Sequence, residues 1–278
     1  MLKNIFSQSI DCNFNIMHRD MSMHTPLASY PDLRDRNIFV TGGGSGIGAG
    51  IVQAFAEQGA RVAFIDIAEA PSEALAQRIA AAGLSTPWWR RCDVRDIGAL
   101  QGAIAQAEAE LGPFSVLVNN VASDDRHTLE SVTPAYYEER MAINERPALF
   151  AIQSVVPGMR RLGGGSIVNL GSTGWQGKGG GYPCYAIAKS SVNGLTRGLA
   201  RPLGQDRIRI NTVSPGWVMT ERQIALWLDE EGEKELARNQ CLPGKLQPQD
   251  IAQMVLFLAS DAAAMCTAQE FKVDAGWV

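Results

Sequence analysis

The amino-acid sequence predicts an α/β protein with a single doubly wound, Rossmann-type parallel sheet of seven strands and helices on both faces. Three observations support this prediction. Segments with strand and helix patterns alternate from position 37 to the carboxyl end. Consecutive strands are separated by crossovers long enough for parallel pairing. The strands are continuous apolar runs, which is typical of strands whose two faces are both covered by helices.

The elements can be assigned in chain order. A short apolar strand, Asn37–Val40, leads into a glycine-rich turn, and apolar residues at helical spacing then predict a helix over Ile47–Gln58. Six more strands are expected, at Arg61–Asp66, Trp88–Arg91, Ser115–Asn119, Ser166–Asn169, Arg207–Val213 and Glu270–Val273. Further helices are expected at Ser72–Ala82, Ile97–Leu111, Pro134–Val156, Cys184–Leu203 and Pro248–Ser260. Ligands of such folds bind beyond the carboxyl ends of the strands, so motifs at those positions are the first candidates for function.

The chain divides into a short extension and one domain. Residues 1–32 are polar and show no sustained periodicity, so we expect a poorly structured N-terminal extension. Residues 33–278 form the predicted Rossmann-type domain. Within it, residues 217–247 are one long stretch that looks irregular. Because long loops in compact domains are often functional, we expect a lid insertion there.

Composition and charge narrow the class of function. Of the 278 residues, 46% are apolar and 19% are charged, which is ordinary for a globular protein with a core. The formal charge of −4 gives no reason to expect nucleic acid or an anionic membrane as a partner. No apolar run approaches the roughly 18–20 residues of a membrane span. The five cysteines are scattered without a C-x-x-C pair, so we expect no metal site, no disulfide framework and a cytoplasmic protein.

The glycine-rich turn after the first strand is typical of a cofactor-binding loop. Glycines there permit a tight turn and a close approach of the backbone to a pyrophosphate, which also gains from the helix N-terminus. The spacing is Gly-x-x-x-Gly-x-Gly, and the expected cofactor contacts in this loop are Gly42, Ser45, Gly46, Ile47 and Gly48.

Asp66 ends the second strand and predicts the choice of cofactor. A carboxylate at this position can accept hydrogen bonds from the hydroxyls of the adenosine ribose. It would repel a 2′-phosphate, because two like unit charges 4 Å apart cost about 4 kcal/mol at an effective dielectric constant of 20. Neither Ser45 nor Ile67 offers a positive charge in compensation. We therefore expect NAD rather than NADP.

Tyr185 and Lys189 form a candidate catalytic pair. Residues four apart on a helix share a face, and an ammonium beside a phenol favours the phenolate. Such a pair can turn a side chain with an ordinary pKa of about 10 into a general base. By itself, such a pair would indicate no more than two residues on an ordinary helix surface. Its occurrence with a glycine-rich phosphate loop in an α/β pattern favours catalysis.

Together these motifs resemble the short-chain dehydrogenase/reductase family over about residues 33–278. The glycine loop, with Thr41 before it, matches the family's Thr-Gly-x-x-x-Gly-x-Gly motif, and Ser172 stands at the usual thirteen residues before Tyr185. Asn119-Asn120-Val121-Ala122 departs from the family's usual Asn-Asn-Ala-Gly in its last two residues. Asp93 matches the family's contact with the adenine ring, and Pro215-Gly216 matches the motif that borders the nicotinamide.

The resemblance implies a role for each matching residue. Tyr185 would remove the proton of a substrate hydroxyl while hydride passes from the same carbon to the nicotinamide. Lys189 would lower the pKa of the phenol and hold the nicotinamide ribose. Ser172 would hydrogen-bond the substrate oxygen. Asn144 would bend its own helix locally and so hold a water that links Lys189 to solvent. The implied cofactor contacts beyond the glycine loop and Asp66 are Asp93, Val94, Asn119, Tyr185, Lys189, Pro215, Gly216, Val218 and Thr220.

Within the family the chain looks most like the sugar-oxidising branch, the aldose 1-dehydrogenases. Asp124-Asp125-Arg126-His127, Asn239-Gln240-Cys241-Leu242 and the end of the chain from Val273 to Trp277 carry this likeness. The implied reaction oxidises the C1 hydroxyl of an aldose, a pentose such as D-xylose, to the lactone. The expected substrate contacts are Asp124, Ser172, Gln176, Tyr185, Trp217 and Arg222. His127 is expected to be structural, as a lone histidine usually is.

Two other functions stay open. One is a dehydrogenase or reductase for another secondary alcohol or ketone, such as a polyol, a 3-oxoacyl compound or a steroid-like substrate, although a polar lid disfavours an apolar one. The other is a non-catalytic NAD-binding protein, which the intact set of Asn144, Ser172, Tyr185 and Lys189 disfavours. Family members are commonly tetramers, so a homotetramer is expected. The small residues Ser190, Ser191, Gly194 and Gly198 would permit close packing between subunits or simply face the sheet.

Overall fold

A seven-stranded parallel sheet forms the centre of the protein in the computed structural model, which describes residues 28–278. The strands are β1 (Asn37–Thr41), β2 (Arg61–Asp66), β3 (Trp88–Arg91), β4 (Val116–Asn119), β5 (Gly165–Leu170), β6 (Ile208–Pro215) and β7 (Glu270–Val273). They lie in the order β3-β2-β1-β4-β5-β6-β7, and every neighbouring pair is parallel. The order reverses between β1 and β4, where a doubly wound sheet opens a crevice for ligands. The predicted fold class is confirmed.

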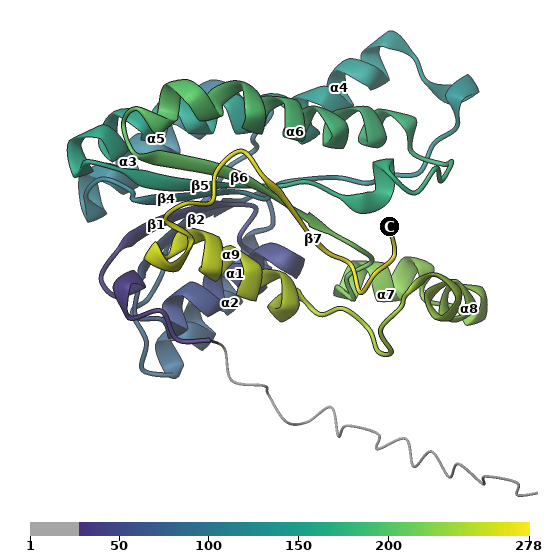
Figure 1. The fold of residues 1–278 in the computed structure, drawn as a ribbon, viewed down its shortest axis with the longest axis horizontal. Coiled ribbons are helices and arrows are strands. Elements are labelled where there is room, and N and C mark those ends of the chain that lie inside the picture. The colour runs from purple at the N-terminus through teal and green to yellow at the C-terminus, as the bar shows by residue number, and fades with distance from the viewer. Residues whose placement is uncertain (1–27) are drawn as a thin grey trace, which may run out of the picture.

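Helices cover both faces of this sheet (Figure 1). One layer holds α1 (Gly46–Glu57), α2 (Glu69–Ala81) and α9 (Pro248–Ala259). The other holds α3 (Ile97–Leu111), α4 (Pro134–Asn144), α5 (Arg146–Leu162) and α6 (Pro183–Gly204). Along β1, Ile38 and Val40 pack into one core and Phe39 into the other, all fully buried. Burial on both faces is the physical reason for the continuous apolar runs of the strands.

The helix predicted over Pro134–Val156 is divided into α4 and α5. Glu145, with φ −125° and ψ −62°, separates the two. Pro147 lies two residues after Glu145, and its missing N–H and fixed ring disfavour a continuous helix through this point. The side chain of Asn144 is thereby free to bind the loop after β4. Its Oδ1 accepts from the Ser123 N–H at 2.7 Å, and its Nδ2 donates to the Ser123 carbonyl at 3.1 Å.

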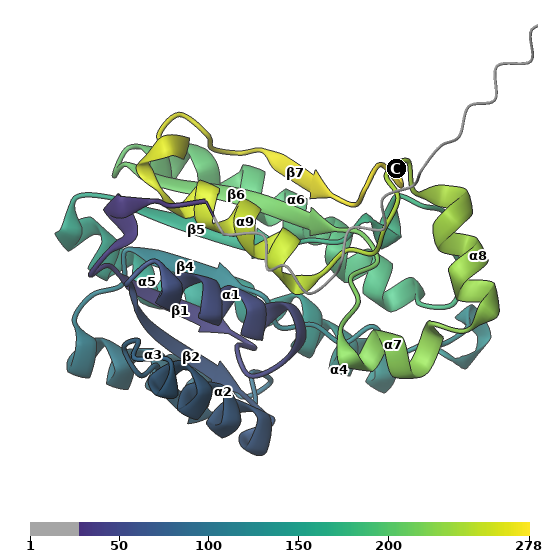
Figure 2. The same ribbon diagram turned by 90° about the horizontal axis from the view of Figure 1, so that it is seen from below.

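The region predicted as an irregular lid contains two helices, α7 (Glu221–Trp227) and α8 (Glu230–Asn239). The prediction of an irregular stretch was therefore wrong. Both helices begin with ordinary capping residues, which are signals of helix starts. Thr220 accepts from the Gln223 N–H and Asp229 accepts from the Gly232 N–H, and the first turn of α8 contains three acidic residues. Figure 2 shows both helices side by side at one end of the sheet.

The segment before β1 lies against the layer of α1 and α9. The Tyr30 N–H donates to Gln58 Oε1 at 2.8 Å, and the Ala28 N–H donates to Gln253 Oε1 at 3.1 Å. A short 3-10 helix, Pro31–Leu33, then buries Leu33. The predicted N-terminal extension therefore has its last residues, 28–32, in contact with the domain, while residues 1–27 lie outside the described part.

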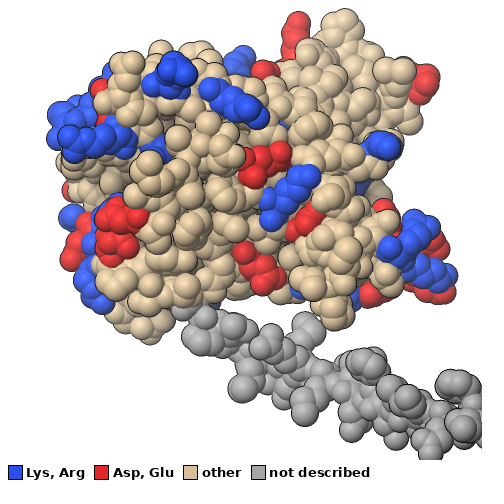
Figure 3. All heavy atoms as spheres, in the orientation of Figure 1, with Lys and Arg blue, Asp and Glu red and all other residues tan. Residues whose placement is uncertain are grey.

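The apolarity of the helices and the distribution of surface charge are two further features of the fold. Among residues 28–278 we find no helix that is both long and apolar enough to cross a membrane. On the face seen in Figure 3, basic and acidic side chains are scattered among neutral ones.

Candidate active site

A cavity of about 1220 Å³ lies at the carboxyl ends of the strands. Its walls come from the loops after β1 to β6, from the start of α6, from α7 and α8, and from Trp277 near the end of the chain. The cavity is thus continuous from the glycine loop to the predicted catalytic pair. Most of the residues predicted as cofactor contacts line it: Gly42, Ser45, Gly46, Ile47, Gly48, Asp66, Asp93, Val94, Tyr185, Lys189, Pro215, Gly216, Val218 and Thr220.

The glycine loop is shaped to bring backbone close to a ligand. Gly42 has φ +68°, which glycine adopts without strain. A Cβ at Gly48 would collide with the carbonyl oxygen of Gly42, so the helix can approach the strand only without a side chain there. Because α1 begins at Gly46, its first free N–H groups face the cavity. This arrangement fits the pyrophosphate of a dinucleotide cofactor.

Asp66 lies beside this loop and is already held by two backbone donors. Its Oδ2 accepts from the Gly44 N–H at 2.8 Å, and its Oδ1 accepts from the Ala68 N–H at 2.9 Å. Each carboxylate oxygen has a further lone pair, so the group can still accept from ribose hydroxyls. The two bonds fix its negative charge at the rim of the cavity.

Arg95 is a cation that lines the cavity beside Asp93, and sequence reasoning missed it. Its Nη2 lies 2.6 Å from Asp93 Oδ2, and its Nη1 lies 3.1 Å from Glu139 Oε1. The hydrogen bonds from Arg95 hold the pKa of Asp93 below its ordinary value. The signal in the sequence was its place two residues after Asp93, which lets one guanidinium reach that carboxylate.

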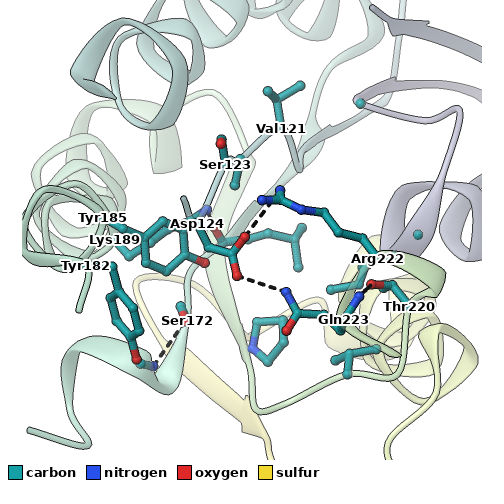
Figure 4. Close-up of a pocket in the computed structure, with 18 of the residues that line it drawn as sticks. Val121, Ser123, Asp124, Ser172, Tyr182, Tyr185, Lys189, Thr220, Arg222 and Gln223 are labelled. Atoms are coloured by element: carbon teal, nitrogen blue, oxygen red, sulfur yellow. Dashed lines mark hydrogen bonds and ion pairs between the residues drawn. The ribbon is translucent and has the colours of Figure 1, made fainter. Parts of the chain in front are cut away.

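Tyr185, Lys189 and Ser172 meet in the middle of the cavity (Figure 4). Tyr185 and Lys189 lie on one face of α6, with the Lys189 Nζ 5.8 Å from the centroid of the Tyr185 ring. Lys189 donates to the Leu170 carbonyl at 2.7 Å. Ser172 follows β5, and its Oγ accepts from the Gly174 N–H at 3.0 Å. Three chemically matched groups from two elements therefore converge, as the sequence predicted.

Burial dominates the protonation of this group. It raises the pKa of Tyr185 to about 12, although a hydrogen bond with Ser172 acts in the opposite direction. Burial also lowers the pKa of Lys189 to about 8. The expected lowering of the phenol pKa by Lys189 is not produced by the protein alone. The Lys189 ammonium donates to the Leu170 carbonyl, and desolvation is the largest influence on the pKa of Tyr185.

A second, small cavity of about 20 Å³ lies behind Lys189 and is lined by Thr41, Asn119, Asn144 and Asn169 among others. Its size and polar lining suit one water. Asn119 points into this space. Its Nδ2 donates to Asn169 Oδ1 at 2.9 Å and so joins β4 to β5. The predicted cofactor contact of Asn119 thus falls behind the main cavity, which its neighbours Asn120 to Ala122 line instead.

Polar side chains from the loop after β4, from α7 and from the segment before α7 line the other end of the cavity. Asp124 Oδ2 accepts from Gln223 Nε2 at 2.8 Å, and Asp124 Oδ1 lies 3.3 Å from Arg222 Nη1. Gln223 in turn accepts from Trp217 Nε1 at 3.0 Å. Figure 4 shows Asp124 between Tyr185 and these two lid residues. Asp124, Trp217 and Arg222, which the sequence predicted as substrate contacts, therefore line the same cavity as Tyr185.

Gln176 is placed differently from its predicted role as a substrate contact. A 3-10 helix, Thr173–Trp175, follows Ser172 and turns the chain toward β7. Gln176 Nε2 consequently donates to Glu270 Oε1 at 2.9 Å. The turn sets this direction, and closeness to Ser172 in sequence gave no sign of it.

Other aromatic and charged residues line the cavity near Asp124 and Tyr185 as well. Trp277 packs edge-on against Trp217 with ring centroids 6.3 Å apart. The Arg126 guanidinium lies 4.3 Å from the Tyr182 ring centroid and 4.9 Å from that of Trp227. These residues give this part of the cavity indole faces and fixed charge. Such a combination suits a ligand with both polar groups and a flat apolar side.

Comparison with known proteins agrees with this geometry. A family model described as enoyl-(acyl carrier protein) reductase matches residues 42–278. The D-xylose 1-dehydrogenase of Caulobacter vibrioides (strain NA1000) is 46% identical over 250 residues, 90% of this chain and 98% of that protein. A probable galactose dehydrogenase of Rhizobium meliloti (strain 1021) is 47% identical over 254 residues, 91% of this chain and 99% of that protein.

Solved structures give the same result. A 7α-hydroxysteroid dehydrogenase complexed with NADH and 7-oxo glycochenodeoxycholic acid superposes with a TM-score of 0.84 at 30% identity, covering 89% of this chain and 97% of the other. The matches span nearly the whole described domain, including the glycine loop and the convergent Ser172, Tyr185 and Lys189. The chain is an oxidoreductase acting on CH–OH groups and belongs to the short-chain dehydrogenase/reductase family.

Proposed function

We propose that the protein oxidises the C1 hydroxyl of a cyclic aldose to the aldonolactone with NAD, and that a pentose such as D-xylose is the favoured sugar. The observation that carries the proposal is the polar, indole-lined end of the cavity, where Asp124, Gln223 and Trp217 are linked by hydrogen bonds beside Tyr185. Sugars need several hydrogen-bond partners and a flat apolar surface. The names of the two curated relatives, a xylose and a galactose dehydrogenase, support the same substrate class.

The residues of the chain have distinct tasks in this reaction. The bound cofactor supplies an oxidised nicotinamide that accepts hydride from C1. Tyr185 takes the proton of the C1 hydroxyl, so that the carbon–oxygen bond becomes a carbonyl as hydride leaves. Ser172 donates a hydrogen bond to that oxygen and holds it beside the phenol. Lys189 passes the proton on toward the small polar cavity, where a water held near Asn144 links it to solvent.

The preference for NAD rests on the fixed charge of Asp66. We expect Asp66→Asn, which keeps the size of the side chain, to raise kcat/KM with NADP by about tenfold or more, since removing 1.4 kcal/mol of repulsion already gives a factor of ten. The efficiency with NAD should fall, because the amide accepts fewer hydrogen bonds. Initial rates at 340 nm give kcat/KM with NADP and with NAD. A wild-type enzyme that is equally efficient with NADP would contradict the preference.

Asp124 is proposed to bind sugar hydroxyls. Asp124→Asn keeps its volume but loses the charge that Arg222 and Gln223 orient, and hydrogen bonds to charged groups contribute about 1.5–3 kcal/mol. We therefore expect the KM for the sugar to rise about tenfold or more while the KM for NAD stays within about twofold. Lys234→Ala, which alters an exposed residue of α8 that pairs with its helix neighbours Glu230 and Glu231, is the control. An unchanged sugar KM in Asp124→Asn would remove Asp124 from the site.

The substrate class itself can be tested directly. NADH formation at 340 nm is measured with NAD and a panel of aldoses, polyols and hydroxy acids. Strong turnover on D-xylose, L-arabinose, D-galactose or another aldose, without turnover on polyols, is the expected result. Activity confined to polyols or hydroxy acids would keep the family chemistry and discard the sugar. Silence on every compound with NAD still bound would favour a non-catalytic protein.

We also propose a homotetramer in the cytoplasm. Gly194 and Gly198 on α6 have open space where a Cβ would stand, as judged against residues 28–278, so they face away from the sheet. Exposed Leu149 on α5 and Ile187 on α6 add apolar surface to the same layer. The cysteines of the described region are free thiols, compatible with a reducing compartment. Sedimentation velocity should give a species of four chains, and a monomer would contradict the proposal.

A further inference from the structure

The catalytic helix α6 begins after a segment that does little to fix its position. Residues 177–181 contain four glycines, and Lys178 and Gly181 both have positive φ. The first residue of the helix is Pro183, which has no N–H to donate. The first N–H of the helix therefore belongs to Cys184, the residue directly before Tyr185. The group that accepts a hydrogen bond from the Cys184 N–H therefore sets the position of the helical turn that carries the Tyr185 phenol.

His127, in the loop after β4, provides that acceptor. The Cys184 N–H donates to His127 Nε2 at 3.1 Å, across 57 positions of sequence. The backbone of the same residue gives a second link, because the His127 N–H donates to the Gly181 carbonyl at 2.8 Å. Two bonds from one residue thus hold both the end of the glycine segment and the start of the helix.

The protonation of the imidazole is fixed by its partners. Its Nδ1 lies 2.9 Å from the Asp125 carbonyl oxygen, which can only accept, so Nδ1 carries the hydrogen. Nε2 must then present its lone pair, as the Cys184 N–H requires. The Tyr136 hydroxyl lies 3.1 Å from Nδ1, and its ring packs edge-on against the imidazole. One neutral tautomer satisfies both sides of the ring.

We propose that His127 is a positioning residue for the dehydrogenase reaction: its Nε2 caps α6 and places Tyr185 against the substrate oxygen. The same loop carries Asp124, three residues earlier. The cap therefore also sets the distance between the sugar-binding carboxylate and the phenol that takes the proton. This inference rests on the proposed function, because it assigns His127 a task in the step that Tyr185 performs. A displacement of about 1 Å in a catalytic group can lower a rate by about a hundredfold, so the effect belongs in kcat.

Four variants separate positioning from general stability. His127→Ala removes the acceptor, and His127→Gln restores an oxygen near the place of Nε2. Tyr136→Phe removes the hydroxyl beside Nδ1 and leaves the cap. Asp250→Ala removes the capping carboxylate of α9, which accepts from the Gln247 N–H at 2.7 Å on the other face of the sheet. It therefore destabilises a helix terminus remote from the catalytic groups.

The readouts are kcat and KM with the aldose that proves active, the Kd for NAD and the melting temperature. We expect His127→Ala to lower kcat by about ten- to a hundredfold with the Kd for NAD within about twofold. His127→Gln should recover most of kcat. Tyr136→Phe and Asp250→Ala should keep wild-type kcat, although Asp250→Ala melts earlier. Wild-type kcat in His127→Ala, or an equal loss in His127→Gln, would overturn the proposal.

A spectroscopic test needs neither turnover nor a folded alanine variant. The chain has three histidines, His18, His24 and His127, so selective ¹⁵N-histidine labelling gives few signals, and His127→Gln identifies the one of interest. We expect a neutral imidazole with its proton on Nδ1. A proton on Nε2 would overturn the proposal. If the wild type oxidises no aldose, the proposed function fails, whereas the tautomer still decides whether His127 caps the helix.

Discussion

Replacing Tyr185 by phenylalanine should abolish turnover while the affinity for NAD stays close to that of the wild type. General acid–base groups contribute factors of about 10²–10⁴, so kcat should fall by about a thousandfold or more. NAD affinity should persist because the glycine loop and Asp66, at the opposite end of the cavity, stay intact. Initial rates at 340 nm and calorimetric titration with NAD measure the two quantities.

Tyr137 offers the matched control for this variant. It is an exposed tyrosine on α4, and Tyr137→Phe deletes the same hydroxyl outside the cavity. Its kcat should equal that of the wild type. Appreciable turnover in Tyr185→Phe would show that another group takes the proton, and the mechanism proposed for Tyr185 and Ser172 would be wrong.

Lys189→Met should also abolish turnover, yet it should make the protein more stable. Burial lowers the pKa of Lys189 from 10.5 to about 8, so its ammonium is destabilised in the folded state at pH 7. With 1.36 kcal/mol per pKa unit, this amounts to about 3 kcal/mol, less about 1 kcal/mol for the lost bond to the Leu170 carbonyl. We therefore expect the free energy of unfolding to rise by about 1–3 kcal/mol at pH 7.

The pH dependence gives an independent check of the sign. Because the folded-state pKa of Lys189 is below its unfolded value, the folded state binds fewer protons between about pH 8 and 10.5. Its penalty is fully present below pH 8 and disappears as the pH rises through this window, so this lysine makes the wild type gain stability there. Urea denaturation from pH 7 to 10 should show that gain in the wild type and in Lys272→Met, an exposed control, but not in Lys189→Met. A Lys189→Met protein that is less stable at pH 7 would contradict the account.

The sheet and most of the site were predictable because they depend on local patterns. The strands β1, β2, β4, β5 and β6 are apolar runs buried on both faces, and β2 and β3 have the bounds that the sequence predicted. Tyr185, Lys189 and Ser172 were found because helical spacing and family intervals fix their relation along the chain. Residues that depend only on period and spacing are visible in a single sequence.

The helix α7 and the contacts of the loop after β4 were harder to predict from the sequence, and the reasons are physical. α7 is exposed along most of its length, so it lacks the apolar periodicity by which the other helices were found. The direction of Gln176 is set by a 3-10 turn rather than by a repeating pattern. The contact of His127 with Cys184 spans 57 residues, and only the folded sheet brings the two loops together. These features arise from tertiary contacts, which propensity does not encode.

The tryptophans that line the cavity should allow ligand binding to be followed by intrinsic fluorescence. Three of the six tryptophans, Trp217, Trp227 and Trp277, line the site, and the first two lie just before α7 and at its end. Half of the tryptophan residues therefore report on α7 and on the end of the chain. A sugar that enters should quench or shift it without any added dye, so that binding can be timed separately from hydride transfer.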